Sequence, residues 1–231
     1  MNNVQSKGPK EIKRTRFPIA AIILLGLVVT GVFGAKPFME YLTAQAANPS
    51  GFVGGMITKI WSNYFTDLYA WGLTHVDLNS GDTILDVGFG GGSGIKYLLE
   101  QNGADRIYGI DVSKESLKTA TGINQSAVDA GRVLLSLGDV AQMDFENASF
   151  DIVIAAQSHI YWEELHEGLK ECYRTLNTGG RFLVLCEIDK IEYHLPEYAN
   201  ATDFVQLLYD NGFTNVSTAT HGNYIAFIAT I

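Results

Sequence analysis

Cysteine is scarce in this chain of 231 residues, which contains only Cys172 and Cys186. Neither residue has partners at the short spacings of zinc ligands, so no metal site is expected. Two cysteines also cannot supply a disulfide framework for a domain of this size. We therefore expect both thiols to be buried and reduced. The sequence also lacks internal repeats and low-complexity tracts.

Basic side chains are also in short supply. The chain has 16 Lys and Arg against 25 Asp and Glu, and its formal net charge is −9. Five of the basic residues lie within residues 1–16, which leaves 11 basic and 24 acidic side chains for the rest of the chain. Binding to a phosphate backbone depends on clustered Lys and Arg, so nucleic acid is not expected as a partner. Small molecules, lipids or proteins are the favoured substrates.

Charge is missing altogether from Phe17 to Ala35, a run of 19 residues bounded by Arg16 and Lys36. A helix of this length would span about 28 Å, close to the thickness of the hydrocarbon core of a bilayer. Three interpretations compete: a transmembrane or membrane-anchor helix, a cleaved signal peptide, and a buried helix. A signal peptide usually has a shorter apolar stretch close to its cleavage site. The main domain is complete without this segment, so a membrane anchor is favoured.

The predicted organisation has four parts. Residues 1–16 form a basic tail, 17–35 the membrane segment, 36–53 a linker and 54–231 the main domain. The domain opens with a helix over residues 54–75, because apolar side chains recur there at three- and four-residue steps. This apolar stripe consists of Met56, Ile60, Tyr64, Leu68 and Trp71. Packing against the domain explains the stripe, and part of it can also cover a ligand.

Short apolar runs alternate with longer helical patterns from Asp82 onward. Such alternation predicts an α/β domain with a doubly wound, mostly parallel sheet. The predicted strands are residues 83–87, 106–110, 133–137, 151–156, 181–187, 215–220 and 224–231. The predicted helices are residues 92–102, 114–130, 162–176 and 202–211. Only three residues, 221–223, join the last two strands, which must therefore be antiparallel neighbours.

The first predicted strand leads directly into Asp86-Val87-Gly88-Phe89-Gly90-Gly91-Gly92. Glycines at the carboxyl end of a parallel strand let the backbone turn sharply and approach a ligand. The following helix adds unpaired N–H groups. A dinucleotide fingerprint needs Gly-x-Gly-x-x-Gly, and neither frame of this loop has that spacing. The Asp86 carboxylate would also repel a pyrophosphate, whereas it suits the positively charged, phosphate-free end of S-adenosylmethionine.

Two further acidic residues follow the next two strands. Asp111 ends the second strand, where a carboxylate can accept hydrogen bonds from both ribose hydroxyls. Asp139 follows the third strand and suits an adenine amino group. A helix N-cap or a solvated turn explains a single acid at such a position. Three acids after three successive strands, beside a glycine run, instead favour a cofactor site.

Residues 82–187 resemble a class I S-adenosylmethionine-dependent methyltransferase, in particular the small-molecule branch that includes the ubiquinone and menaquinone biosynthesis methyltransferases. The resemblance rests on ILDVGFGGG (84–92), YGIDVS (108–113), GDV (138–140), FDIVIA (150–155) and LNTGGR (176–181). It implies a Rossmann-like, seven-stranded sheet with an antiparallel last strand, S-adenosyl-L-methionine as cofactor, and helix 54–75 as a cap. The implied cofactor-binding residues are Asp86, Gly88, Gly90, Gly92, Asp111, Val112, Asp139, Val140 and Gln157.

The segment after the fourth strand, residues 157–162, lies where acceptors commonly meet the methyl group in this family. The Asn/Asp-Pro-Pro-Tyr/Phe motif of many nitrogen methyltransferases is absent there, which argues against DNA, RNA or protein amide nitrogen. His159 is the candidate catalytic base, and a hydrogen-bonded structural histidine is the alternative. Core packing or a solvated turn is the alternative for each residue of the candidate acceptor pocket, which comprises Tyr64, Tyr161, Trp162 and Glu187.

The leading interpretation is a membrane-bound methyltransferase for a small or lipophilic acceptor. A non-catalytic S-adenosylmethionine-binding protein and, with less support, an NAD-type oxidoreductase are the alternatives. The basic tail predicts a cytoplasmic N-terminus, and one membrane crossing would then place the domain outside the cytoplasm. S-adenosylmethionine is made inside cells, so the two inferences conflict. We give the cofactor more weight and expect a single-pass or interfacial anchor in the cell membrane, with the domain facing the cytoplasm.

Overall fold

The computed structural model describes residues 51, 66–101 and 104–231. The basic tail, the apolar segment 17–35, most of the linker, Tyr64 and the first part of the helix predicted over 54–75 lie outside these residues. The remainder of that helix is present as α4 (Thr66–Gly72), followed by the 3-10 turn η1 (Leu73–His75). Within the described part of the chain, no helix is both long enough and apolar enough to cross a bilayer.

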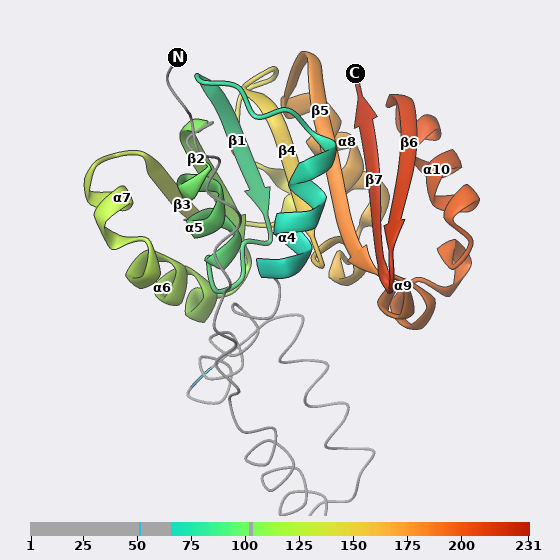
Figure 1. Cartoon of the computed structure of the whole chain (residues 1–231), viewed down its shortest axis with the longest axis horizontal. Helices are drawn as coiled ribbons and strands as arrows, with labels where there is room; N and C mark the ends of the chain where they lie inside the picture. The colour runs from blue at the N-terminus through green and yellow to red at the C-terminus, as the bar shows by residue number, and fades with distance from the viewer. Residues whose placement is uncertain (1–50, 52–65, 102–103) are drawn as a thin grey trace, which may run out of the picture. The chain divides into compact units, whose positions relative to one another are not determined.

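Seven strands form one sheet, in the order β3-β2-β1-β4-β5-β7-β6 (Figure 1). Only β7 runs against its neighbours β5 and β6, and the other adjacent pairs are parallel. The predicted α/β sheet with an antiparallel last strand is therefore confirmed. The strands are β1 (Asp82–Val87), β2 (Ala104–Asp111), β3 (Val133–Leu137), β4 (Phe150–Ala156), β5 (Leu176–Glu187), β6 (Thr214–His221) and β7 (Tyr224–Thr230).

Helices cover both faces of the sheet and create two apolar cores (Figure 1). The first face carries α4, α5 (Ser93–Glu100), α6 (Lys114–Ile123) and α7 (Gln125–Asp129). The second carries α8 (Leu165–Thr175), α9 (Ile188–His194) and α10 (Ala201–Asp210). A strand covered on both faces needs apolar side chains on both sides. Accordingly, Val153 of β4 enters one core while Ile152 and Ile154 enter the other, and all three are fully buried.

Three features differ from the predicted elements. The single helix expected over 114–130 is divided at Asn124, whose Nδ2 donates to the carbonyls of Gly92 and Ala120 at 2.9 and 3.0 Å. The helix expected over 162–176 begins only at Leu165, after the 3-10 turn η3 (His159–Tyr161). Helix α9 and the 3-10 turn η4 (Pro196–Tyr198) follow β5, where no element was predicted. The chain there lacks the length and clear apolar period that reveal a helix in sequence.

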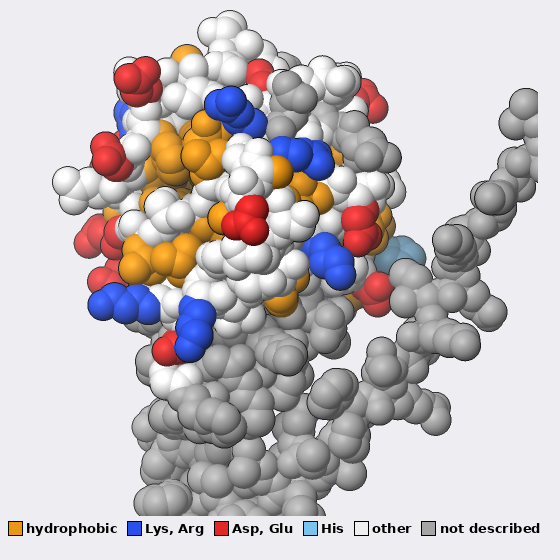
Figure 2. Space-filling model, turned by 90° about the vertical axis from the view of Figure 1, so that its left-hand side faces the viewer, with side chains coloured by type: hydrophobic (Ala, Val, Ile, Leu, Met, Phe, Trp, Pro, Cys, Tyr) orange, Lys and Arg blue, Asp and Glu red, His pale blue; other side chains and the backbone are white. Residues whose placement is uncertain are grey.

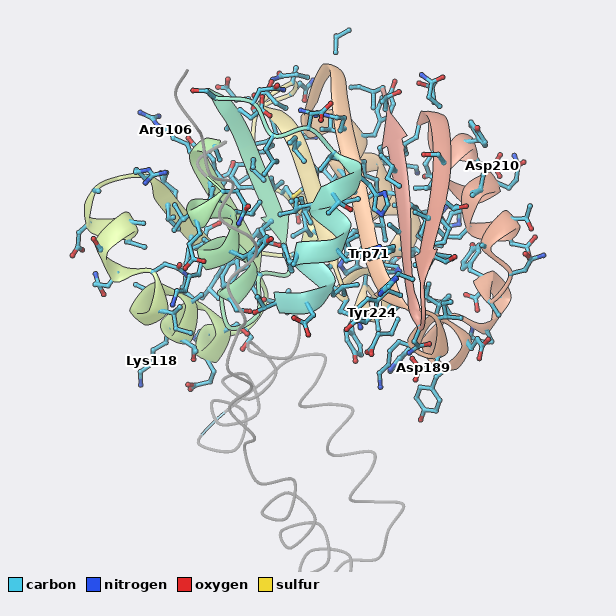
Figure 3. The ribbon with its side chains drawn as sticks, in the orientation of Figure 1. Trp71, Arg106, Lys118, Asp189, Asp210 and Tyr224 are labelled. Atoms are coloured by element: carbon cyan, nitrogen blue, oxygen red, sulfur yellow. The ribbon has the colours of Figure 1, made fainter. Side chains whose placement is uncertain are left out.

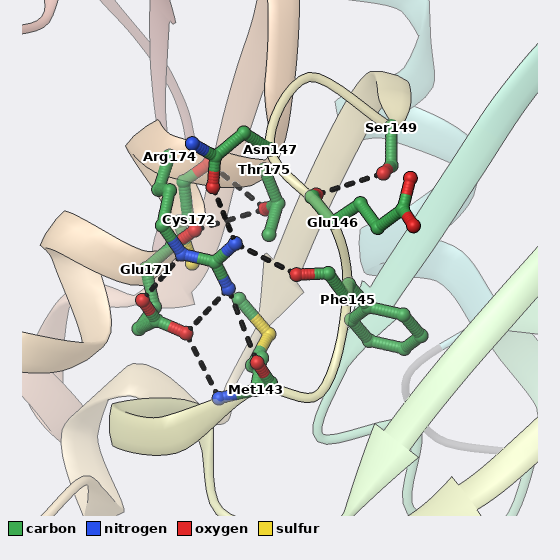
Figure 4. Close-up of polar contacts among 9 residues, drawn as sticks. All are labelled: Met143, Phe145, Glu146, Asn147, Ser149, Glu171, Cys172, Arg174 and Thr175. Carbon is green, nitrogen blue, oxygen red and sulfur yellow. Dashed lines mark hydrogen bonds and ion pairs between the residues drawn. The ribbon is translucent and has the colours of Figure 1, made fainter.

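Arg174 fastens the loop between β3 and β4 to α8 (Figure 4). Its guanidinium donates to both carboxylate oxygens of Glu171, at 2.6 and 2.7 Å, and to the carbonyls of Met143 and Phe145. The Asn147 side chain accepts a further hydrogen bond at 2.9 Å. Glu171 completes the network by accepting from the Met143 amide at 2.9 Å. A planar donor with several N–H groups is suited to such a network, which leads the chain from η2 (Val140–Gln142) back into β4.

The edge strand β3 leaves apolar side chains in solvent. Leu134 and Leu137 are 43% and 42% exposed, and Val112, directly after β2, is 50% exposed. Figure 2 views this side of the molecule and shows hydrophobic side chains interspersed with charged ones. Leu137 pairs in register with Asp111 of β2. The exposed apolar atoms therefore extend to the carboxyl edge of the sheet.

Candidate functional site

The candidate site lies at the edge where β1, β2, β4 and β5 end. In an open α/β sheet, ligands bind beyond the carboxyl ends of the strands. Because β7 is antiparallel, it begins at this edge, and Tyr224 pairs there with Glu187 at the end of β5. The order of the strands therefore brings the ends of β1, β2 and β4 to one edge of the sheet, with Asp86, Asp111 and Gln157. Sequence reasoning placed all three there.

The loop after β1 adopts a conformation that favours glycine. Gly88, Gly90 and Gly92 have φ values of 76°, 51° and 79°, which side-chain-bearing residues rarely adopt. A Cβ on Gly88 would collide with Ser158, and one on Gly92 would lie 2.6 Å from the Ala120 Cβ. A Cβ on Gly90 would meet no atom within 4 Å. The loop is therefore packed against the protein at both ends and open in the middle, as a ligand-binding loop requires.

Asp111 ties this loop to the end of β2. Its Oδ2 accepts from the Gly90 amide at 2.9 Å, and its Oδ1 accepts from the Ser113 amide at 2.8 Å. Burial raises the pKa of Asp111, while these two backbone hydrogen bonds act in the opposite direction. Each carboxylate oxygen retains a lone pair for a ligand. The side chain thus shapes the loop and can also accept from hydroxyl groups.

Asp86 is fully buried at the end of β1. Its Oδ1 accepts from the hydroxyl of Tyr69 on α4 at 2.7 Å, while its Oδ2 has no hydrogen-bond partner among the residues that the structure describes. Burial raises the pKa of Asp86 to about 7, the Tyr69 hydrogen bond lowers it, and the nearby Asp111 charge raises it further. Tyr69 was missed by the sequence analysis, because it lies about 100° around the helix from Leu68 and so outside the apolar stripe. Its burial is seen only in the folded structure, where the hydroxyl has Asp86 as its partner.

Asp139 and Val140 follow β3 and differ in their burial. Asp139 is exposed, and its Oδ1 caps η2 by accepting from the Ala141 amide at 2.9 Å. Val140 is 7% exposed and belongs to the core between the sheet and α8. The N-cap explanation therefore accounts for the position of Asp139. Its predicted contact with adenine stays a prediction.

Gln157 and Glu187 join the ends of β4 and β5. The Gln157 Nε2 donates to Glu187 Oε2 at 2.8 Å, and its Oε1 accepts from the Cys186 thiol at 2.9 Å. Both side chains are buried, at 8% and 7% exposure. Gln157 has a φ of 55°, a strained value for a residue with a side chain. The burial of Glu187 argues against a solvated turn, and its place in an acceptor pocket stays a prediction.

His159 lies in the core instead of at the strand ends. It is fully buried, and its ring packs edge-on against Phe204 of α10 at 5.3 Å and Trp162 at 6.4 Å. Neither ring nitrogen has a hydrogen-bond partner among the described residues, and the alternative of a hydrogen-bonded structural histidine stays a prediction. Burial lowers the pKa of His159 to about 3, which keeps the ring neutral. Its action on an acceptor stays a prediction, because a base must also reach the proton that it removes.

Trp162 and Tyr161 differ in their surroundings. Trp162 covers Gly168 of α8, where a Cβ would lie 2.7 Å from the indole ring, so core packing accounts for it. Tyr161 packs edge-on against His194 of α9, with ring centroids 4.8 Å apart. Burial raises the pKa of Tyr161 to about 12, and the charges of Cys186 and Glu187 act in the same direction. Tyr161 therefore lies near the buried carboxylate at the end of β5.

Aromatic side chains from α4 and the β6–β7 hairpin form a second wall at this edge. The ring of Trp71 lies 6.0 Å from that of Tyr224 and 6.2 Å from that of His221. Figure 3 shows Trp71 and Tyr224 next to each other between α4 and β7. Burial raises the pKa of Tyr224, and the charges of Asp67 and Glu187 add to the effect. Trp71 was predicted only as part of the apolar stripe, and Tyr224 was not predicted as a site residue.

The described residues fit S-adenosylmethionine better than a metal or a dinucleotide. No cluster of three or more His, Cys, Asp or Glu suited to a metal occurs among them. The unpartnered, buried Oδ2 of Asp86 can accept from an ammonium group, and it would repel a pyrophosphate. The open face at Gly90 leaves room for a ligand beside Asp111. The exposed Val112 and Leu137 offer an apolar surface for an adenine ring.

A pocket of about 300 Å³ lies elsewhere in the described structure. It is lined by residues of α5 and of the segment from Ile123 to Arg132, and none of the predicted site residues lines it. Its lining residues are Lys96, Leu99, Glu100, Ile123, Asn124, Ser126, Ala127, Ala130 and Arg132.

Comparison with known proteins shows which protein family this chain resembles. Residues 85–184 match the family model described as a methyltransferase domain. An uncharacterized methyltransferase, YdaC of Bacillus subtilis, is 31% identical over 114 residues, which are 49% of this chain and 61% of that protein. Phosphoethanolamine N-methyltransferase 2 of Caenorhabditis elegans is 27% identical over 153 residues, which are 62% of this chain and 35% of that protein. The chain thus spans less than two thirds of either relative.

A solved structure shows the same fold. The S-adenosylmethionine-dependent methyltransferase from Aquifex aeolicus superposes with a TM-score of 0.65 at 19% identity. The superposition covers 77% of this chain and 98% of that one. The small-molecule branch that the sequence resembles is not distinguished by these comparisons.

Proposed function

Because this chain contains a class I S-adenosylmethionine-dependent methyltransferase domain, we propose that the protein transfers a methyl group from S-adenosylmethionine to a small or lipophilic acceptor. The observation that carries the proposal is the carboxyl end of β1. Within the described residues, the buried Asp86 leaves one oxygen unpartnered there, and the glycine loop that follows is open at Gly90. Bound S-adenosylmethionine would supply an electrophilic methyl group on a sulfonium.

The chain's own residues would bind and align the reactants. Asp86 accepts from the α-amino group, Asp111 from the ribose hydroxyls, and the amides of the glycine loop face the ligand. Methyl transfer to a nucleophile depends mainly on alignment and exclusion of water, and it needs a base only for an acceptor that must lose its proton. The predicted cofactor roles of Val112, Asp139, Val140 and Gln157 belong to the same proposal.

The acceptor enters between the ends of β4, β5 and β7. Glu187 and Tyr161 border this region, and Trp71 and Tyr224 add aromatic surface that the sequence analysis did not assign. Aromatic rings and a carboxylate suit a small organic acceptor with a hydrogen-bond donor or a positive charge. The similarity to a phosphoethanolamine methyltransferase supports a small acceptor. His159 stays a candidate general base, but we favour Glu187 for this role because His159 is buried in the core.

Membrane attachment through residues 17–35 remains part of the proposal, with the domain on the cytoplasmic side where the cofactor is made. The support is the uncharged run of 19 residues. Protease treatment of intact cells tests the topology, since a cytoplasmic domain is protected until the cells are opened. Degradation of the domain in intact cells would contradict this orientation.

Transfer of label from methyl-labelled S-adenosylmethionine into a cell extract, with its lipid fraction included, tests the activity. Label in a small molecule or lipid is expected from the wild-type chain and not from an Asp86→Ala variant. Tight binding of S-adenosylmethionine without any transfer would favour the alternative of a non-catalytic binding protein. Reduction of NAD in place of methyl transfer would favour the oxidoreductase alternative.

A further inference from the structure

Tyr69 belongs to α4, a helix outside the family match at residues 85–184, yet it contacts Asp86 at the end of β1 and the helix that follows the glycine loop. Its side chain is 5% exposed. Its ring fills the space above Gly94, where a Cβ would collide with the phenol carbons. The glycine at the second position of α5 thus lets the ring lie directly against the helix that follows the glycine loop.

The hydroxyl of Tyr69 contacts one oxygen of a fully buried carboxylate and leaves the other free. Asp86 Oδ1 receives the hydrogen bond at 2.7 Å, and Asp86 Oδ2 is buried without a partner in the described part of the chain. An unsatisfied carboxylate oxygen is costly in a folded protein unless a ligand or water satisfies it. The Asp86 carboxylate is therefore a preorganised hydrogen-bond acceptor. Tyr69 fixes one of its oxygens, and the second oxygen is left for a donor.

We propose that Tyr69 is a positioning residue for cofactor binding, and that its hydroxyl holds Asp86 as an oriented carboxylate whose Oδ2 receives the α-ammonium group of S-adenosylmethionine. This inference rests on the proposed function. It assigns to α4 a direct part in cofactor affinity, besides its packing on the sheet. A charged carboxylate binds an ammonium group more strongly than a neutral carboxylic acid does, so the protonation state of Asp86 controls affinity.

The Tyr69 hydroxyl should have a measurable effect on the pKa of Asp86. Burial raises the pKa of Asp86 to about 7, and the negative charge of Asp111 acts in the same direction. Tyr69 is the group that opposes them, because a hydrogen bond donated to the charged form lowers the pKa. Tyr69 itself stays protonated, since burial and the Asp86 charge raise its pKa well above the ordinary value. Removal of the hydroxyl therefore raises the pKa of Asp86.

The test is calorimetric titration of the full-length protein with S-adenosylhomocysteine, which carries the same α-amino group, from pH 5.5 to 8.5. Wild-type affinity should fall as the pH drops below about 7, where Asp86 becomes protonated. In Tyr69→Phe, the midpoint should move up by about one pH unit, as expected for the loss of a hydrogen bond to a charged group. The affinity at pH 7 should then fall by about fivefold, because the charged fraction of Asp86 drops from about one half to about one tenth. At high pH the two proteins should bind almost equally.

Four further variants separate positioning from packing. Tyr209→Phe, on the exposed face of α10, should behave as wild type. Asp86→Asn should bind weakly without this pH dependence, and adding Tyr69→Phe to it should change affinity little, because the two residues act through one contact. Replacement of Tyr69 by 3-fluorotyrosine keeps the ring and strengthens the donor. It should therefore move the midpoint down, even if Tyr69→Phe proves too unstable to titrate.

An equal loss of affinity at every pH in Tyr69→Phe, or an unchanged midpoint with 3-fluorotyrosine, would overturn the inference and leave Tyr69 with a packing role. Either outcome would leave the proposed function intact, because the wild-type protein would still bind the ligand. Failure of the wild-type protein to bind S-adenosylhomocysteine at any pH would overturn the proposed function and the inference together.

Discussion

The side chains of Gln157 and Glu187 are joined by a 2.8 Å hydrogen bond that connects the ends of β4 and β5. The contact buries a carboxylate beside the position where an acceptor would approach the methyl donor. Gln157 holds this carboxylate from a strained backbone conformation, with a φ of 55°. Such strain is found where the surrounding structure requires a particular geometry. In the proposed function, the pair is the main feature on the acceptor side.

We expect Glu187→Gln to reduce transfer to the acceptor without a matching loss of cofactor binding. The substitution keeps the shape of the side chain and can keep the bond to Gln157, but it removes the charge. Loss of a charged contact with the acceptor should lower kcat/KM by about tenfold or more. The measurement is label transfer to the acceptor found in the extract, beside titration with S-adenosylhomocysteine. Glu192→Gln, an exposed change on α9, is the control. Equal turnover in both variants would contradict the role.

Gly90 and Gly92 should respond differently to alanine. Gly92→Ala places a Cβ 2.6 Å from that of Ala120 at a φ of 79°, so it should lower the free energy of unfolding by about 3 kcal/mol. Gly90→Ala should cost only about 1 kcal/mol, because its Cβ enters open space. That same Cβ occupies the ligand's side of the loop, so S-adenosylhomocysteine affinity should fall sharply. Denaturant unfolding and calorimetry measure the two effects. Unchanged affinity in Gly90→Ala would place the ligand elsewhere.

The sheet could be predicted from sequence because its central strands are apolar on both faces and each ends in a short turn. The order of elements, the antiparallel hairpin and the three acids at strand ends follow from that pattern. The prediction of one continuous helix over residues 114–130 was wrong. The helix is broken at Asn124, and the break depends on the contact of Asn124 with Gly92, 32 residues earlier. Long-range contacts of single side chains leave no periodic signal.

The same reason explains the residues that the site prediction missed. Tyr69 meets Asp86 only after α4 packs on the sheet, and Trp71 meets Tyr224 only after the hairpin folds back beside β5. The choice of His159 as base followed from its place after the fourth strand. The 3-10 turn there directs the ring into the core toward Phe204. Strand ends were therefore predictable, whereas side-chain directions in the turns were not.

His159 should make the domain sensitive to acid. Its pKa is about 3 when folded, below the ordinary value of 6.5, so the unfolded chain binds the proton more strongly. The stabilising effect of the neutral ring is complete above pH 6.5 and is lost as the pH falls toward 3, by about 1.4 kcal/mol per pH unit. In His159→Phe, the stability should depend less on pH in this window. Denaturant unfolding at pH 4.5 and 7 compares the two proteins.

The same variant bears on the predicted catalytic role. If His159→Phe keeps both turnover and the pH profile of methyl transfer, the base hypothesis is excluded. Loss of turnover in a variant that is folded and still binds S-adenosylhomocysteine would instead support it. An identical pH dependence of stability in the wild type and the variant would contradict the buried, neutral state of His159.

Arg174→Ala should loosen the loop between η2 and β4. It removes the paired hydrogen bonds to Glu171 and leaves two carbonyls and a carboxylate without their donor, at a cost of about 2 kcal/mol. The Arg174 hydrogen bond lowers the pKa of Glu171 from its ordinary value of 4.5. The contribution is therefore present above pH 4.5 and is lost as the pH falls through the lower folded value. Thermal unfolding of wild type and variant at pH 7 and pH 3 checks this, and an equal difference at both would contradict it.

The central claim is that the carboxyl edge of the sheet, at Asp86, Gly90 and Asp111, binds S-adenosylmethionine. Calorimetric titration of the full-length protein at pH 8 with S-adenosylhomocysteine, and separately with NAD, tests it most directly. The account predicts one site for S-adenosylhomocysteine, strongly weakened in Asp111→Asn, and no heat of binding for NAD. Binding of NAD, or an Asp111→Asn variant that binds S-adenosylhomocysteine as tightly as the wild type, would contradict it.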